Sequence, residues 1–258
     1  MPIVNGMYYA EYQGNNSAQP PVVLIHGAGS DHLCWPVNLR RLNGFRVLAP
    51  DLPGHGRSAG VSHQSVQEYA ADLIAFLDAL GIFSVVLVGH SLGGAVALET
   101  ALLHSAQVTA LALISTAAHT HIPAEFLNHL SSPASVKNAR HWLQERLLSP
   151  ESGAVLMRKS SVALESVRQE VLHNDWKAVA SFDRCGSLKE IAQPARVICG
   201  KNDRIVPLAG SRHLAASLPN AHLQVIPNAG HLVLLEKPEI IAEGINQFLV
   251  ELSLPNSS

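Results

Sequence analysis

Residues 84–103, SVVLVGHSLGGAVALETALL, decide the fold. They read as a buried strand, the five-residue turn GHSLG and a helix rich in Ala and Leu. A serine on a sharp strand-to-helix turn projects its hydroxyl above the sheet, beside the helix N-terminus. Gly89 and Gly93 leave the space that a Cβ would fill, and Gly94 lets the helix pack closely on adjacent strands. The pattern predicts a strained turn that presents Ser91, although a glycine-rich turn with a merely solvated serine has the same motif.

Strands and helices alternate on both sides of this stretch. The apolar run at 21–25 fits a strand covered on both faces, and the i, i+3, i+4 spacing at 65–80 predicts an amphipathic helix that stops at Gly81. Such alternation predicts an α/β fold with a mostly parallel sheet and helices on its faces, and a ligand site beyond the carboxyl ends of the strands. The expected strands are 7–12, 21–25, 45–50, 84–88, 108–114, 195–200 and 221–226, with further helices at 34–42 and 237–252.

The alternation lapses between residues 116 and 185. Five helices broken by Pro and Gly are expected there, at 122–130, 134–148, 153–164, 166–173 and 175–182. We therefore expect a core of residues 1–115 and 187–258, interrupted by a helical insertion at 116–186. A helical insertion between two strands is well placed to act as a lid over a pocket, or it is a stabilising excursion without a role in recognition.

Composition limits the classes of partner. The chain has 258 residues, 47% hydrophobic and 15% charged, with a formal net charge of −2. These values favour a folded domain over a disordered chain and give no polyanion-binding surface, so we expect no nucleic acid partner. Apolar runs have strand length, so we expect no stable association with a membrane. The sequence leaves the oligomeric state open between monomer and homodimer.

The N-terminus and the cysteines indicate the compartment. Residues 1–13, MPIVNGMYYAEYQ, have neither the basic nor the apolar region of a signal peptide. Cys34, Cys185 and Cys199 are odd in number and widely spaced, which favours reduced thiols over disulfides or a zinc site. Both observations predict a cytoplasmic protein.

Two glycine-rich loops follow strands upstream of Ser91. In HGAG at 26–29, a backbone N–H at the end of a central strand can point into the space above the sheet, as an oxyanion hole requires, although a plain turn has the same residues. In DLPGHGRS at 51–58, Asp51 and His55 could be imagined as metal ligands, but no cluster of carboxylates or thiols accompanies them. A turn with no metal is the preferred interpretation.

Three side chains follow strand ends in the order Ser91, Asp203, His231. A serine hydroxyl is a poor nucleophile near neutral pH, so it needs an imidazole to accept its proton and a carboxylate to orient that imidazole. We therefore expect Ser91 as nucleophile, His231 as base and Asp203 as the orienting acid. The backbone N–H groups of Leu92 and Ala28 would hold the developing oxyanion.

The chain resembles the α/β-hydrolase family over essentially its whole length. The resemblance implies an eight-stranded, mostly parallel sheet with a helical cap after the sixth strand, and neither a metal nor an organic cofactor. It assigns nucleophile, acid and base to the same Ser91, Asp203 and His231. The motifs that carry it are HGAG at 26–29, DLPGHGRS at 51–58, GHSLGG at 89–94, GKNDRIVP at 200–207 and NAGHLVLLEKP at 228–238.

The expected activity is that of a carboxylesterase acting on small esters through an acyl-serine intermediate. Epoxide hydrolases and haloalkane dehalogenases carry an aspartate at the position of Ser91. Carbon–carbon bond hydrolases typically show N-S-M-G-G, whereas this chain has His90 and Leu92 around its serine. A narrow-specificity relative remains an alternative: a carbon–carbon bond hydrolase, an enol-lactonase or a thioesterase. A small-molecule receptor with a retained triad is the alternative of another class. A cap arginine that faces the pocket would favour an acid-bearing substrate, and the candidates are Arg140, Arg146, Arg158, Arg168 and Arg184.

Overall fold

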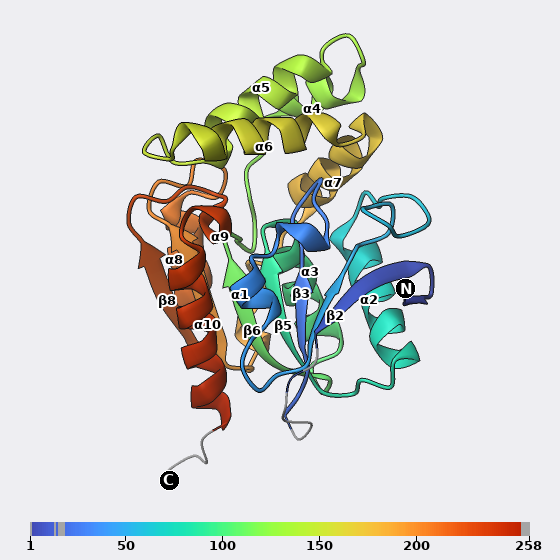
Figure 1. Cartoon of the computed structure of the whole chain (residues 1–258), viewed down its shortest axis with the longest axis vertical. Coiled ribbons are helices and arrows are strands. Elements are labelled where there is room, and N and C mark those ends of the chain that lie inside the picture. The colour runs from blue at the N-terminus through green and yellow to red at the C-terminus, as the bar shows by residue number, and fades with distance from the viewer. Residues whose placement is uncertain (1, 13, 15–18, 254–258) are drawn as a thin grey trace.

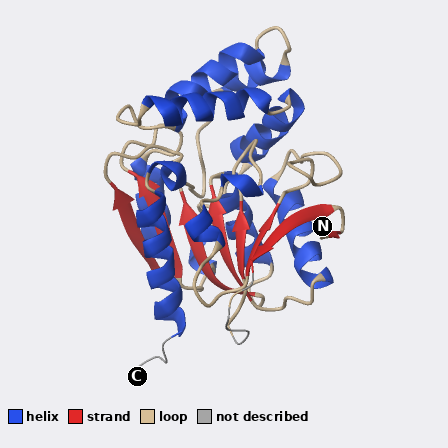
Figure 2. Cartoon of the chain, in the orientation of Figure 1, coloured by secondary structure: helices blue, strands red, loops and turns tan. Residues whose placement is uncertain are grey.

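One eight-stranded sheet forms the centre of the molecule (Figures 1 and 2). The computed structural model describes residues 2–12, 14 and 19–253. The strand order is β1-β2-β4-β3-β5-β6-β7-β8. The pairs β1–β2 and β2–β4 are antiparallel and the other neighbours are parallel, which confirms the predicted fold class. The strands are β1 (Ile3–Val4), β2 (Met7–Tyr12), β3 (Val22–Ile25), β4 (Val47–Pro50), β5 (Val85–His90), β6 (Val108–Ile114), β7 (Ala195–Gly200) and β8 (Ala221–Ile226).

Helices cover both faces of this sheet, so its central strands are buried on both sides. Along β3, Val23 and Ile25 pack into one apolar cluster and Val22 and Leu24 into the other, because successive side chains of a strand point to opposite faces. The first cluster includes side chains of α2 (Val66–Ala79), α3 (Leu92–Leu103) and α8 (Leu208–Ser217). The second includes side chains of α1 (Val37–Arg40), α9 (Val233–Glu236) and α10 (Pro238–Ser253).

Four helices between β6 and β7 form a layer beyond the carboxyl ends of the central strands, seen at the top of Figure 1. We call this segment, residues 124–181, the helical cap. It has its own apolar cluster, which includes Phe126, Leu143 and Trp176. The two ends of the cap segment meet, because β6 and β7 are neighbours in the sheet and His119 bridges to Asp183. Its helices are α4 (Ala124–Ser131), α5 (Val136–Leu147), α6 (Ala154–Ser166) and α7 (Gln169–Ser181).

The last part of the cap differs from the sequence prediction. We expected a break between helices at 166–173 and 175–182, but α7 runs through Asn174 without interruption. Asn and Asp usually compete with the helix by bonding to nearby backbone. Here Asn174 and Asp175 are buried and bond to residues more than 100 positions away, so this competition is removed.

Two other differences concern short elements. Strand β1 has only two residues, too few for an apolar period, and was not expected as a separate strand. The helix expected at 34–42 is a 3₁₀ turn, His32–Cys34, followed by the single turn of α1. None of the helices in the part of the chain that the structure describes is long and apolar enough to cross a membrane.

Candidate functional site

The turn after β5 is sharper than the sequence predicts. The strand continues to His90 and α3 begins at Leu92, so the turn is Ser91 alone and not the five residues expected. Ser91 has φ 53° and ψ −116°, a conformation that a residue with a Cβ rarely adopts. Its N–H donates to the carbonyl of Ile114, 2.9 Å away on the neighbouring strand. Sheet pairing therefore holds this serine in its strained conformation.

Small residues make this turn possible, as predicted. A Cβ on Gly93 would overlap the carbonyl oxygen of Ile25, and one on Gly89 would overlap that of Gly93. A Cβ on Gly94 would lie 2.5 Å from the side chain of Thr116. The helix thus lies directly on β3 and on the residues that follow β6.

The structure brings the three predicted side chains into one row. The Ser91 hydroxyl lies 2.9 Å from Nε2 of His231, and Nδ1 of His231 lies 2.9 Å from Oδ2 of Asp203. A carboxylate only accepts, so Nδ1 carries the hydrogen and Nε2 is free to accept the proton of Ser91. The hydroxyl, imidazole and carboxylate therefore stand in the order that a proton transfer from serine requires.

The carboxylate of Asp203 is buried and held by further hydrogen bonds. The other oxygen of Asp203 accepts from the backbone N–H groups of Ile205 and Val206, at 2.8 and 2.9 Å. The side chains of Asp203 and His231 are 0% and 3% exposed. Charge on the imidazole would therefore be stabilised mainly by Asp203, because water has little access.

His90 holds the loop that carries His231, a role that the sequence does not reveal. Its Nε2–H donates to the carbonyl of His231 at 3.0 Å. Burial, and then the nearby His231, lower the pKa of His90 to about 3, so this imidazole stays neutral and remains a donor near neutral pH. His90 is therefore a support for the loop that carries His231.

The predicted oxyanion donors come from two segments, the start of α3 and the loop after β3. Leu92 is the first residue of α3, where backbone N–H groups have no partner within the helix and the dipole favours negative charge. Ala28 lies in the loop after β3 and lines a cavity together with Ser91 and His231. A Cβ on Gly27 would lie 2.8 Å from Nδ1 of His90, so this loop also lies close to the turn of Ser91.

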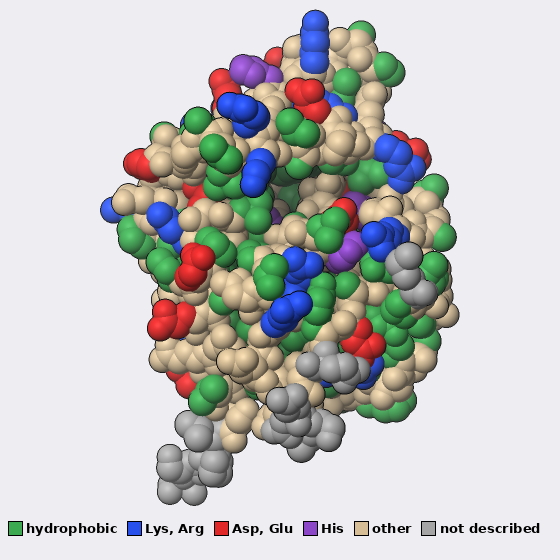
Figure 3. Space-filling model, in the orientation of Figure 1, with side chains coloured by type: hydrophobic (Ala, Val, Ile, Leu, Met, Phe, Trp, Pro, Cys, Tyr) green, Lys and Arg blue, Asp and Glu red, His purple; other side chains and the backbone are tan. Residues whose placement is uncertain are grey.

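The cavity has a volume of about 550 Å³ and lies between the sheet and the cap. Figure 3 shows this face of the molecule hollowed below the cap, with histidine side chains at the edge of the hollow. The cap contributes mostly apolar walls and one cation, from Leu164, Val167, Arg168, Val171 and Trp176. The Nε–H and Nη groups of an arginine can bind a carboxylate in a fixed orientation. The guanidinium of Arg168 is already oriented by the bond that it donates to the carbonyl of Gly54, 2.6 Å away.

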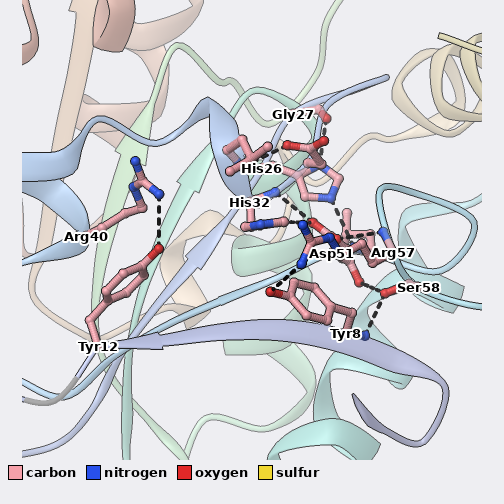
Figure 4. Close-up of polar contacts among 12 residues, drawn as sticks. Tyr8, Tyr12, His26, Gly27, His32, Arg40, Asp51, Arg57 and Ser58 are labelled. Carbon is pink, nitrogen blue, oxygen red and sulfur yellow. Dashed lines mark hydrogen bonds and ion pairs between the residues drawn. The ribbon is translucent and has the colours of Figure 1, made fainter. Parts of the chain in front are cut away.

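Asp51 and His55, which could be imagined as metal ligands, bond to different partners. Oδ1 of Asp51 accepts from the backbone N–H and from Nδ1 of His32, and Oδ2 accepts from the N–H of Arg57 (Figure 4). His55 instead contacts Asp175. The carboxylate of Asp51 therefore fixes the turn after β4.

Asp175 of α7 organises a second buried cluster, which no sequence motif points to. Its Oδ2 accepts from the N–H of Gly29 at 2.7 Å and from Nε2 of His55 at 2.8 Å. Its Oδ1 accepts from the hydroxyl of Tyr69 at 2.5 Å. The only sequence signal is an acidic residue inside an otherwise amphipathic helix, and without the docked cap that signal has no meaning.

Glu236 forms a comparable link on the opposite side of the cavity. Its Oε1 accepts from the N–H of Gly230, the residue before His231, at 2.8 Å. Its Oε2 accepts from the N–H of Ser149 and the hydroxyl of Ser152, at 2.9 and 2.6 Å, in the connection between α5 and α6. The cap is thus bonded to both loops that border Ser91.

Known proteins resemble this arrangement along most of the chain. A sequence model described as the Alpha/beta hydrolase family matches residues 22–243. A 2-hydroxy-6-oxo-2,4-heptadienoate hydrolase of Pseudomonas putida is 30% identical, across 89% of this chain and 88% of its own. A putative carbamate hydrolase, RutD, of a Caulobacter species is 28% identical, across 95% of this chain and 96% of its own.

A solved structure gives the same result for the fold. The esterase from Thermogutta terrifontis superimposes with a TM-score of 0.85 at 25% identity, covering 96% of this chain and 94% of its own.

Proposed function

Because the chain belongs to the alpha/beta hydrolase family, we propose that it is a serine hydrolase that cleaves small carboxylic esters through an acyl-serine intermediate. Hydrolysis is the chemistry that the family and the relatives share by name. The observation that carries the finer proposal is the row Ser91, His231, Asp203 at the wall of the cavity. The Thermogutta terrifontis esterase supports an ester as the substrate.

In the proposed reaction, Ser91 attacks the acyl carbon while its proton passes to Nε2 of His231. The bond to Asp203 keeps the imidazole in the tautomer that can accept this proton, and stabilises the imidazolium that forms. The imidazolium then returns the proton to the leaving alcohol. Water activated by His231 attacks the acyl enzyme, which releases the acid and restores the hydroxyl of Ser91.

Backbone N–H groups of Leu92 and Ala28 are the proposed oxyanion donors. The position of Leu92 at the N-terminus of α3 favours developing negative charge. Removing one such donor typically costs about 3 kcal/mol of transition-state stabilisation. This stabilisation requires that each N–H group already points to the position of the oxyanion before the reaction begins.

The division into a core of residues 1–115 and 187–258 and a lid at 116–186 is part of this proposal. The cap walls of the cavity support a role of this insertion in substrate recognition. A cytoplasmic location, the absence of a nucleic acid or membrane partner, and a monomeric or homodimeric state remain predictions.

The test uses p-nitrophenyl esters with acyl chains of increasing length. We expect steady-state turnover preceded by a burst of p-nitrophenol when deacylation is the slow step. Ser91→Ala should reduce kcat by at least about 10,000-fold, because the remaining groups provide only binding and oxyanion stabilisation. Alanine keeps a Cβ, so the backbone strain at this position is unchanged.

Ser105→Ala is the matched control, since Ser105 is exposed beyond the end of α3. It should keep wild-type activity. Absence of turnover for every acyl length with folded wild-type protein would reject the proposal, as would full activity of Ser91→Ala.

A second candidate is cleavage of a carbon–carbon bond in an acid-bearing substrate. Arg168 lines the cavity from the start of α7, and its bond to Gly54 needs only one of the five N–H donors of a guanidinium. The relative from Pseudomonas putida is named for a dienoate substrate. Faster turnover of vinylogous diketone acids than of esters, with a large rise in KM in Arg168→Gln, would favour this candidate.

A further inference from the structure

One contact between the cap and the core is made by a buried carboxylate. Asp175 lies on α7, yet its side chain is 0% exposed and all three donors recorded for it belong to core segments: Gly29, His55 and Tyr69. Burying a carboxylate is costly unless it is paired and fully hydrogen-bonded. These three hydrogen bonds compensate for the burial of the carboxylate, and they also fix the position of Asp175.

One of these partners belongs to the loop that carries Ala28. Gly29 has φ +64°, and a Cβ built on it would lie 2.8 Å from Leu172 and 3.1 Å from Val167, both in the cap. The loop therefore runs directly beneath the cap. The N–H of Gly29 donates to Oδ2 of Asp175 at 2.7 Å, and this bond fixes the orientation of the peptide between Ala28 and Gly29. On the other side of Ala28, Gly27 lies close to His90, and its carbonyl accepts from the N–H of Ser30 at 3.2 Å.

The second partner, His55, lies in surroundings that favour its protonated form. Its Nδ1 faces the carbonyl of Pro53 at 3.0 Å and its Nε2 faces Asp175 at 2.8 Å, and both of these oxygens only accept. Each nitrogen must therefore carry a hydrogen. Burial by itself lowers the pKa of His55, but the charge and hydrogen bond of Asp175 outweigh it, and the net shift is upward. When His55 is protonated, its charge cancels that of Asp175, and the two form a buried ion pair beside the cavity.

We propose that Asp175 is a positioning residue that sets the oxyanion loop, so that docking of the cap completes the site. The proposal rests on the assignment of Ala28 as an oxyanion donor in the proposed ester hydrolysis. Asp175 touches no reacting atom. It acts through Gly29, and it makes the rate of acyl transfer depend on how the cap is seated. Ground-state binding of an ester should depend on it much less, because the oxyanion exists only during reaction.

The test is Asp175→Asn, which keeps the shape of the side chain but removes the charge that pairs with His55. Active sites are counted by complete reaction with a p-nitrophenyl phosphonate, so that unfolded protein is excluded. We expect kcat per active site to fall by about 10- to 100-fold, the range that a small misplacement of a catalytic group causes. KM should change by less than about threefold, and the affinity for a trifluoromethyl ketone, which forms an oxyanion on Ser91, should fall in parallel with kcat/KM.

Asn174→Ala is the matched control on the same helix. Asn174 is also buried and also bonds the cap to the core, through Ser62 and Gln64, but it has no contact with the loop of Ala28. It should lower stability and leave kcat per active site unchanged. Equal losses of kcat in the two variants, or an unchanged kcat in Asp175→Asn, would overturn the proposal.

Tyr69→Phe is the milder variant if Asp175→Asn does not fold. It removes the bond to Oδ1 of Asp175 and keeps the bond to Gly29. We expect kcat to fall by about two- to fivefold, again with KM nearly constant, and no effect on kcat would overturn the proposal. A wild-type protein that hydrolyses no ester would overturn both this proposal and the proposed function, whereas an active wild type with insensitive variants would overturn this proposal alone.

Discussion

The turn of Ser91 and the loop of Ala28 line the same cavity, but different interactions hold them. The turn is built into the sheet: it joins a buried strand to a buried helix, and the close packing of Gly93 on Ile25 leaves it no room to move. The loop lies outside the regular elements and is held by a carboxylate from the cap. Backbone packing holds the turn, whereas the loop depends in part on one long-range side chain, Asp175.

This difference separates two kinds of failure. A change that disturbs the turn disturbs the core, so it should be seen first as a loss of stability. A change in the contacts between cap and loop leaves the sheet intact, so it should lower the rate of the molecules that remain folded. The cap can therefore tune the chemistry of a nucleophile whose own geometry it does not control.

Asp203→Asn provides the reference for a purely chemical loss, with the turn and the loop both left in place. Asparagine can present an N–H to His231 and thereby favour the wrong tautomer, so kcat should fall by about 10,000-fold while the thermal midpoint changes little. Steady-state kinetics and circular dichroism melting check this. Asp72→Asn, an equal change of charge at a half-exposed site on α2, is the control and should be fully active. A loss below about tenfold would remove Asp203 from the row.

Gly93→Ala tests whether the turn fails through stability. The added Cβ would overlap the carbonyl of Ile25, which is backbone and cannot swing aside. We expect about 3 kcal/mol of destabilisation or more, near the upper end for overpacking, and a fall in Tm of roughly 6–12 °C for a chain of this size. Gly186→Ala, which meets nothing within 4 Å, should shift Tm by less than about 2 °C. A stable but inactive Gly93→Ala would contradict the contrast drawn here.

The two regions should also respond to pH in opposite directions. His90 supports the Ser91 side and is buried neutral, with its pKa lowered to about 3 by burial and then by His231. Below about pH 6.5 the unfolded chain binds a proton that the folded one does not, so stability falls by about 1.4 kcal/mol per pH unit, or about 2 kcal/mol between pH 6.5 and 5.

Urea unfolding of wild type and His90→Gln at these two pH values isolates this contribution, since the variant should lose less stability on acidification. His55 has the opposite sign because its pKa is raised, so its contribution is present at low pH and lost as the pH rises through its folded value. It faces Asp175, the carbonyl of Pro53 and the rings of His26 and Tyr69. An equal loss of stability on acidification in His90→Gln and wild type would contradict the contribution assigned to His90.

Glu236→Gln should give the mildest effect, because the loop of His231 has other supports. The variant weakens the bonds to Gly230 and Ser149, at a cost of about 1–2 kcal/mol in stability. The bond from His90 to the carbonyl of His231 remains, so kcat should fall only several-fold. Glu239→Gln, at an exposed site three residues later, should match the wild type in both measurements. A loss of kcat as large as that of Asp175→Asn would show that the base loop depends on the cap as strongly as the oxyanion loop does.

The parts of the site that could be predicted from the sequence are those set by local backbone. A buried strand followed by glycines and a helix locates Ser91, and strand ends locate Asp203 and His231, because parallel strands bring their carboxyl ends to one edge. The mostly parallel sheet follows from the same alternation. Whether the three residues act as expected remains the subject of the proposed experiments.

What could not be predicted depends on contacts between distant segments. Asp175 has partners 106 to 146 positions away, and only the docking of α7 reveals that an acidic residue is buried there. The break expected near Asn174 has the same origin, because the helix continues where the side chain of Asn174 bonds to the distant Ser62. His90 was noted only as a departure from another motif, because nothing local indicates its bond to His231.

The cap segment leaves the sheet after β6 and returns at β7, next to each other, with its ends bridged at His119 and Asp183. Because both connections of the cap lie side by side, the cap could be exchanged as one segment between homologous proteins. A chimera joined at these two connections would exchange the cap walls of the cavity in one step. It would recover the full rate only if the graft also supplies an acid where Asp175 stands, so the recipient scaffold and the donor module must be matched at that position.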